Sequence, residues 1–100
     1  MENKELYTQF DNVFFEKSRL SIITILYKEE KASFNRLKTI LKSTDGAVYS
    51  HLQKLLKYGY IEEIKEITGN NLQTFYNLTE NGKNVFKGYI SFLENLVQSK

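Results

Sequence analysis

Cysteine is absent from this chain of 100 residues, and histidine occurs only once. Without cysteine the protein has no disulfide framework, thiol switch or thiolate metal ligand, and one histidine cannot form a histidine cluster. The composition therefore suits a reducing, cytoplasmic location, and we expect no metal site and no bound cofactor.

Long apolar runs are also missing. No stretch approaches the roughly 20 apolar residues that cross a bilayer, and the first ten residues, MENKELYTQF, lack the apolar core of a signal peptide. Catalytic motifs are missing as well, because there is no glycine-rich phosphate loop, metal constellation or nucleophile–histidine motif. We therefore predict a protein that is neither exported nor membrane-bound, and that is not an enzyme.

The chain does contain enough apolar material for one modest core. Hydrophobic residues make up 41% of the sequence, and phenylalanine and tyrosine contribute seven residues each. Because a chain of this length normally forms one folding unit, residues 1–100 are predicted to be a single domain.

The net charge of +2 hides an uneven distribution. Residues 31–60 contain six basic side chains and one acidic side chain, whereas residues 61–80 contain one basic and four acidic side chains. A basic block of this kind predicts contact with a polyanion, although an ordinary solvated lysine surface is an equal alternative on charge alone. The six basic residues are Lys31, Arg36, Lys38, Lys42, Lys54 and Lys57.

The stretch TDGAVYSHLQKLLKYGYI, Thr44 to Ile61, has the features of a helix with one buried face. Thr44 can accept a hydrogen bond from free N–H groups at the helix start, Asp45 suits the positive end of the helix dipole, and Gly59 ends the helix. The predicted buried face consists of Val48, Leu52, Leu55 and Leu56. The predicted free face consists of Ala47, Tyr49, Ser50, Gln53, Lys54 and Lys57. His51 lies at the border, where we favour a structural role over a ligand-binding one.

Two further elements are predicted before this stretch. A helical stripe of apolar residues runs from about Ser18 to Glu30, and a short helix could precede it. Lys31–Phe34 could hold one or two strand residues before Ser33 caps a second helix. The predicted buried face of that second helix consists of Phe34, Leu37, Ile40 and Leu41. Two short helices joined by a tight turn make a helix-turn-helix, here at about residues 33–58.

The segment after Gly59 is ambiguous, because Ile61, Ile64 and Ile67 recur at intervals of three and would also fit a helix. We favour a strand, since the turn-forming residues TGNN follow and the next residues, TFYNL, are β-branched and aromatic. The sequence therefore predicts a β-hairpin, or wing, at about residues 60–78.

The last predicted helix covers about residues 79–98 and begins at Thr79. Its apolar residues cover more than the stripe that docks on one core, which favours a homodimer. The alternative is that this helix folds back over the helix beginning at Ser18 and buries everything internally. The predicted dimer interface consists of Phe10, Phe14, Phe86, Tyr89, Ile90, Phe92, Leu93, Leu96 and Val97.

Four motifs occur in a fixed order: SRLSIITIL (18–26), SFNRLKTIL (33–41), TDGAVYSHLQKLLKYGYI (44–61) and FYNLTENGK (75–83). Together they resemble the MarR/ArsR-like winged helix-turn-helix transcriptional regulators, particularly the small single-domain members. The resemblance covers most of the chain. It implies a mainly α fold with a small β-hairpin (α+β) and a long C-terminal dimerisation helix.

The resemblance also implies which residues meet double-stranded DNA. Residues expected near base edges and nearby phosphates are Gly46, Ala47, Tyr49, Ser50, Gln53 and Lys54. Residues expected near the DNA backbone are Asn35, Arg36, Lys42, Ser43 and Thr44. The wing departs from the family pattern, because its tip, Gly69 to Leu72, carries no cation. Asn70 and Asn71 can still hydrogen-bond to DNA, and a purely structural hairpin is an equal alternative.

The implied activity is sequence-specific regulation of transcription, with a homodimeric repressor bound to an inverted-repeat operator. A winged-helix module that binds protein instead of DNA is the alternative, because the hairpin is acidic. A small-molecule effector is possible, but no residue pattern marks a pocket for one.

Overall fold

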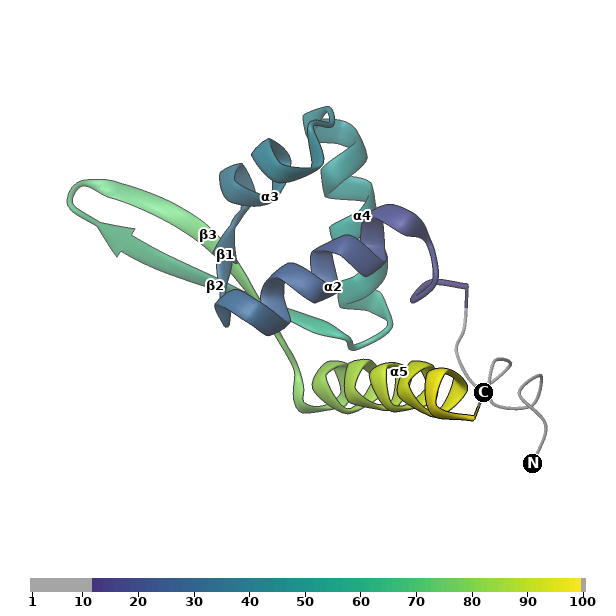
Figure 1. The fold of residues 1–100 in the computed structure, drawn as a ribbon. Coiled ribbons are helices and arrows are strands. Elements are labelled where there is room, and N and C mark those ends of the chain that lie inside the picture. The colour runs from purple at the N-terminus through teal and green to yellow at the C-terminus, as the bar shows by residue number, and fades with distance from the viewer. Residues whose placement is uncertain (1–11, 100) are drawn as a thin grey trace.

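The computed structural model describes residues 12–99, which form four helices and a three-stranded antiparallel sheet (Figure 1). The predicted mainly α fold with a β-hairpin is confirmed. Residues 12–15 form turns, whereas Phe10, predicted at a dimer interface, lies outside the described residues. In chain order the elements are α2 (Lys17–Glu29), β1 (Ala32–Ser33), α3 (Phe34–Leu41), α4 (Asp45–Lys57), β2 (Ile61–Thr68), β3 (Asn71–Leu78) and α5 (Glu80–Gln98).

Side-chain caps set where the helices begin. The hydroxyl oxygens of Ser33, Thr44 and Thr79 each accept a hydrogen bond from the backbone N–H three residues further on, as the sequence predicts. Helix α2 is capped by a carboxylate instead, because Oε1 of Glu16 accepts from the backbone N–H of Arg19 at 2.9 Å. Local sequence therefore defines these helix starts.

The end of α4 is a Schellman motif. Gly59 has a φ of 76°, its N–H donates to the carbonyl of Leu56, and the N–H of Tyr60 donates to the carbonyl of Leu55. Leu55 and Tyr60 are both buried. The chain thus passes from α4 into β2 within a few residues.

The segment that could have continued as a helix is strand β2, so the predicted hairpin is confirmed. Strand β3 lies between β1 and β2, and the hairpin pairing runs from Ile61 opposite Leu78 to Thr68 opposite Asn71. The two-residue loop places Gly69 at a φ of 65°, while Asn70 stays at negative φ, as in a type II′ turn. The hairpin projects away from the helices (Figure 1).

The core lies between α2, α4 and the base of the sheet. Two predictions about it are wrong. Ile40 is 37% exposed, because the short helix α3 docks mainly through Leu37. Phe14 is fully buried against the rings of Tyr60 and Tyr89, both at 5.9 Å between centroids, so it cannot face a second chain. The fully buried side chains are Phe14, Ile22, Ile23, Leu26, Leu37, Val48, Leu52 and Leu55.

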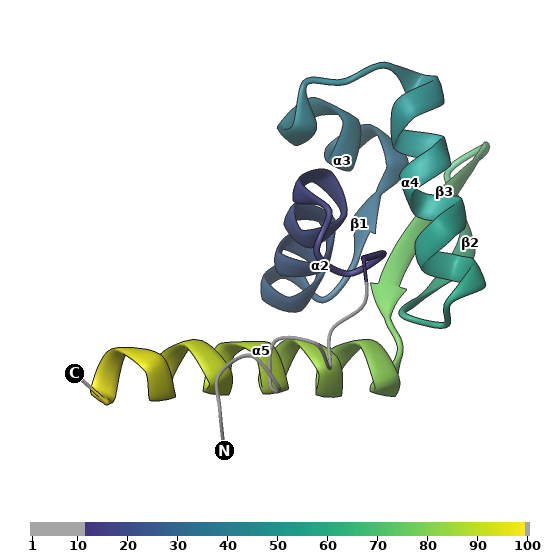
Figure 2. The ribbon, with the colours of Figure 1, turned by 90° about the vertical axis from the view of Figure 1, so that its right-hand side faces the viewer.

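Helix α5 packs on α2 through its first half and extends beyond the helix-turn-helix at its C-terminal end (Figure 2). The rings of Phe86 and Tyr27 meet with centroids 4.8 Å apart. Ile90 and Leu93 are exposed, and Val97 is 74% exposed. The alternative in which α5 buries all its apolar residues internally is therefore wrong. Among residues 12–99, no helix combines the length and apolarity needed to span a bilayer.

Candidate nucleic-acid interface

The turn between α3 and α4 holds the two helices in a fixed relation. Lys42 ends α3 in the left-handed region, with a φ of 51°, and its N–H donates to the carbonyl of Lys38. The ammonium group of Lys38 lies 2.6 Å from a carboxylate oxygen of Asp45 in the first turn of α4. This ion pair ties the start of α4 to α3 and leaves the outer face of α4 uncovered.

The outer face of α4 is polar and open. Tyr49 is 57% exposed, and Ser50, Gln53 and Lys54 are exposed as well. Ala47 is half-buried, so only part of it reaches the surface. A helix face of short hydrogen-bonding and basic side chains matches the donor and acceptor groups of a DNA major groove.

The predicted backbone-contact residues differ in exposure and in whether a contact within the chain already engages the side chain; the Thr44 hydroxyl, for example, caps α4. Asn35, Lys42 and Thr44 are exposed, and Ser43 is half-buried. Arg36 is occupied, because its Nη2 lies 2.7 Å from one carboxylate oxygen of Glu29 and its Nε donates to the other at 3.3 Å.

The Glu29–Arg36 ion pair shifts the pKa of both side chains. The hydrogen bond from Arg36 lowers the pKa of Glu29, and the same bond raises the pKa of Arg36. Arg36 could reach DNA only by exchanging this carboxylate for a phosphate. The structure thus identifies an intramolecular contact that the sequence prediction did not anticipate.

Three of the six basic residues in segment 31–60 form ion pairs within the chain, which leaves three unpaired lysines. Besides Arg36 and Lys38, Lys31 is also paired, with its ammonium 2.7 Å from an oxygen of Glu66. The remaining three basic residues have no carboxylate within ion-pair distance among residues 12–99. These unpaired cations are Lys42, Lys54 and Lys57. They flank the open face of α4, which is where a polyanion would gain most from them.

The acidic side chains of the wing are engaged within the chain. Glu62 accepts a hydrogen bond from Asn77 at 3.0 Å, and Glu63 accepts one from the Tyr76 hydroxyl at 3.2 Å. Glu66 is the partner of Lys31. These contacts weaken the sequence argument that an acidic wing favours a protein partner.

Tyr76 links the wing to the core, because it lies on β3 and is buried. Burial raises the pKa of Tyr76 to about 12, and the neighbouring carboxylate of Glu63 adds to the rise. The Tyr76 hydroxyl is therefore protonated at neutral pH and can donate to Glu63.

The sequence prediction overlooked Lys65 as a wing cation, because it lies outside the turn. The strand register places it opposite Thr74, on the same face as Tyr76, and it is exposed. Lys65 has no ion-pair partner among residues 12–99. Asn70 and Asn71 are exposed at the turn, as predicted. The wing thus presents one cation and the amides of Asn70, Asn71 and Gln73 toward its end.

His51 belongs to a partly buried network that the sequence did not reveal. Nη1 of Arg19 lies 3.0 Å from Nδ1 of His51, and the Nε of Arg19 donates to the carbonyl of Val13 at 2.7 Å. Glu16 lies 3.7 Å from the same histidine nitrogen. Burial would raise the pKa of Glu16, but the backbone N–H of Arg19 and the charges of His51 and Arg19 together lower it. His51 therefore anchors α4 to α2, which agrees with the structural role favoured above.

The exposed apolar face of α5 follows a coiled-coil spacing. Phe86, Ile90, Leu93 and Val97 are separated by four, three and four residues, and the last three are exposed. The other predicted interface residues are less available. Phe86 and Phe92 are buried, and Tyr89 and Leu96 are half-buried.

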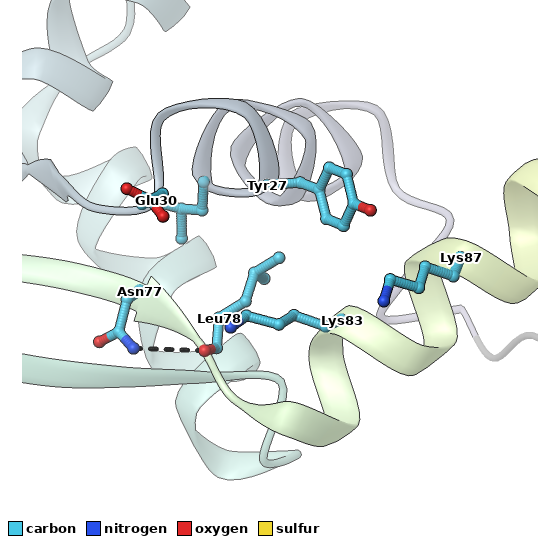
Figure 3. A pocket seen from close by; sticks show the side chains of 7 residues that line it. Tyr27, Glu30, Asn77, Leu78, Lys83 and Lys87 are labelled. Atoms are coloured by element: carbon cyan, nitrogen blue, oxygen red, sulfur yellow. Dashed lines mark hydrogen bonds between the residues drawn. The ribbon is translucent and has the colours of Figure 1, made fainter.

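A cavity of about 250 Å³ lies between α2, β3 and α5 (Figure 3). Lys83 and Lys87 extend into it from α5, opposite Tyr27 and Glu30 of the α2 end. The sequence marked no such pocket. Its charges are mixed, so the lining favours neither an anionic nor a cationic ligand. Among residues 12–99, no three metal-binding side chains gather at one place.

Comparison with known proteins agrees with this geometry. Residues 18–97 match the sequence model of a family described as winged helix DNA-binding domain. An uncharacterized protein of Methanocaldococcus jannaschii is 36% identical over 78 residues, which cover 78% of this chain and 85% of that protein.

Two solved structures extend the comparison. A transcriptional regulator homologue from Pyrococcus horikoshii OT3 superimposes with a TM-score of 0.82 at 25% identity, covering 99% of this chain and 97% of that one. A complex of S. aureus MepR with DNA gives a TM-score of 0.81 at 16% identity, covering 96% and 79% of the two chains. At that identity the second likeness concerns the fold.

Proposed function

This chain belongs to the family of winged-helix DNA-binding domains, and from that premise we propose that it is a homodimeric transcriptional repressor acting on an inverted-repeat operator. The observation that carries the proposal is the open polar face of α4, flanked by three lysines that no carboxylate neutralises among residues 12–99. Support also comes from the S. aureus MepR structure, which has the same fold and contains DNA. On this proposal the protein is a binding protein and not an enzyme.

The proposed DNA face has two parts. Base edges in the major groove meet the α4 face, where hydrogen-bonding side chains can distinguish base pairs. Phosphates meet the unpaired lysines and the backbone N–H groups at the α4 start, because a helix N-terminus attracts anions. The base-edge group is Gly46, Ala47, Tyr49, Ser50, Gln53 and Lys54. The backbone group is Asn35, Lys42, Ser43, Thr44 and Lys57, with Arg36 joining only if it leaves Glu29.

The proposed dimer uses the exposed strip on α5. Ile90, Leu93 and Val97 form an apolar seam that a second copy can cover with its own identical seam, as a two-fold interface requires. Two copies joined in this way would present two α4 helices to successive major grooves, roughly 34 Å apart. Occupation of a promoter by such a dimer would block polymerase, which is the repressor mechanism we propose.

The proposal predicts that the unpaired α4 lysines supply much of the salt dependence of binding. We expect Lys54→Ala combined with Lys57→Ala to weaken binding to a duplex that the unaltered protein selects from a random library. The slope of log K against log salt should become shallower by about 0.9 for each phosphate that the variant no longer neutralises. Titration of the labelled duplex at several salt concentrations measures both quantities.

The matched control removes the same charge elsewhere. Lys83→Ala combined with Lys87→Ala also removes two lysines, but these lie on α5 beside the cavity. We expect this control to keep most of the affinity and the slope. Equal reductions in both double variants, or none in either, would refute the assignment of the DNA face to α4.

A further inference from the structure

The end of the wing carries an exposed apolar pair. Ile67 and Leu72 are directly opposite each other in the strand register, and they are 77% and 63% exposed. The hairpin turn, Gly69 and Asn70, lies just beyond them. A cross-strand pair of this kind adds only a small stabilisation to a hairpin. Folding alone therefore gives little reason for two large aliphatic side chains at this position.

The β2–β3 strand register also places Ile67 and Leu72 far from the core. Ile67 and Leu72 are on the same hairpin face as the buried Tyr76, but four residues further along each strand. At about 3.3 Å per residue, they stand roughly 13 Å beyond the buried base of the hairpin. The pair therefore cannot pack on the core of its own protomer.

The charges around the pair suit an anionic partner. Lys65 lies on the same face, two cross-strand pairs closer to the base, and is unpaired among residues 12–99. The nearest carboxylate along β2, Glu66, points to the opposite face and is neutralised by Lys31. Asn70 adds an exposed amide at the turn. A partner that offers both negative charge and apolar surface therefore fits this end of the wing, and a basic protein does not.

The position of the pair connects it to the proposed DNA face. In Figure 2, α4 and the end of the hairpin both lie on the right-hand side of the molecule, opposite α2. A duplex bound along α4 would therefore extend toward the end of the wing. Apolar side chains that enter a minor groove can wedge between base steps and partly unstack them.

We infer that Ile67 and Leu72 form an apolar wedge that enters the minor groove next to the major groove occupied by α4. This inference rests on the proposed DNA-binding function. Lys65 contacts a phosphate at the edge of that groove, and Asn70 hydrogen-bonds to the groove floor or to a sugar. The wedge replaces the cationic wing tip that the sequence lacks.

The wedge has a consequence for sequence preference. Pyrimidine–purine steps such as TA and CA unstack most easily, so inserting a side chain there costs least. The protein should therefore prefer such steps in the flank of each half-site, at positions where α4 makes no contact. This preference arises from deformability and not from hydrogen bonds to bases.

The test replaces both wedge residues with a polar residue that keeps strand propensity, Ile67→Thr with Leu72→Thr. The probe is the duplex selected by the unaltered protein, with 2-aminopurine placed in turn at each flanking position. We expect the double variant to bind about tenfold more weakly or worse, since it no longer buries two aliphatic side chains. The salt slope should not change, because no cation is removed.

The fluorescence signal tests the unstacking directly. The unaltered protein should raise 2-aminopurine fluorescence at one flanking step in each half-site, and the double variant should not. Gln73→Ala is the control, because Gln73 is exposed beside Leu72 on the opposite hairpin face. It should retain both affinity and fluorescence change.

Two outcomes would count against the wedge, and they differ in meaning. If the double variant keeps the affinity and the fluorescence change, the wedge is refuted, and the apolar pair serves a protein partner or none. If the unaltered protein selects no duplex at all, the proposed DNA-binding function itself fails, and the wedge fails with it. Circular dichroism of the double variant confirms that the hairpin change leaves the fold intact.

Discussion

Gly82→Ala is expected to destabilise the protein by about 3 kcal/mol or more, which is at or above the usual cost of overpacking. Gly82 is buried in the first turn of α5, against the loop that leads from α4 into β2. A Cβ added there would overlap the carbonyl oxygen of Tyr60 and lie 3.0 Å from its carbonyl carbon. Both atoms belong to the backbone, so no side-chain rotation can make room.

The same junction is held by hydrogen bonds that leave it little freedom to move. The Tyr60 carbonyl accepts from the N–H of Thr79 at 3.1 Å, and the Thr79 hydroxyl donates to the carbonyl of Gly59 at 2.6 Å. The N–H of Gly82 donates to that same hydroxyl oxygen. Moving α5 away from Tyr60 would therefore break the cap of α5 as well. This contact gives a physical reason for the glycine in the motif FYNLTENGK.

Gly88 supplies the control in the same helix. A Cβ added at Gly88 meets no heavy atom within 4 Å, and alanine stabilises a helix interior by roughly 0.5–1 kcal/mol relative to glycine. Gly88→Ala should therefore raise the free energy of unfolding while Gly82→Ala lowers it. Urea unfolding followed by circular dichroism, at one fixed protomer concentration, measures both. Similar values for the two variants would contradict the close packing of α5 on Tyr60.

Leu93→Glu is expected to raise the dissociation constant of the dimer by at least about 100-fold, because it places an unpaired carboxylate in an apolar two-fold seam. Ile90 and Val97 flank it on the same strip of α5. Leu93 is exposed in the protomer, so the substitution should leave the fold of each chain unchanged. Sedimentation velocity over a series of protein concentrations measures the change.

Loss of the dimer should also weaken operator binding far more than half-site binding. Two linked recognition helices bind a full operator with an avidity gain of about 100-fold or more, whereas a single half-site gains nothing from the second copy. Asn84→Glu is the control, since it adds the same charge nine residues away, on the opposite side of α5. A Leu93→Glu protein that remains dimeric, or a monomeric unaltered protein at micromolar concentration, would refute the α5 interface.

Features set by local sequence were predicted well. The caps at Ser33, Thr44 and Thr79 depend on a hydroxyl and the next few N–H groups, and the turn at Gly69 depends on one glycine. The short strand β1, Ala32–Ser33, lies within the Lys31–Phe34 segment where one or two strand residues were predicted. The winged-helix fold and family follow from such signals repeated in order, and both are confirmed by the structure and by the matched family.

Features set by contacts between distant residues were not predictable. Arg36 is paired because the end of α2 brings Glu29 beside it, and Glu66 is neutralised by a lysine that is 35 residues away. The net charge counted along a segment of sequence was therefore larger than the charge that remains unpaired on the surface of that segment. Phe14 shows the same limit for apolar residues, because an aromatic ring suits a core and an interface equally until the packing is known.

Arg19 and Lys65 were missed for opposite reasons. Arg19 is a cation of α2, and such a side chain usually reaches solvent, but here it is buried and bonded to His51 and to the carbonyl of Val13. Lys65 stands in an acidic segment, and only the strand register shows that it lies on a different face from Glu66. For Lys65, a single lysine among glutamates is the signal that could have drawn attention to it.

The most direct test of the central claim is a hydroxyl-radical and methylation-protection footprint of the unaltered protein on its selected duplex. A homodimer that places one α4 in each of two successive major grooves should protect two symmetric segments about 10 base pairs apart, centre to centre, with guanine N7 protected in both. A single protected segment, or protection spread evenly along the duplex, would contradict the account.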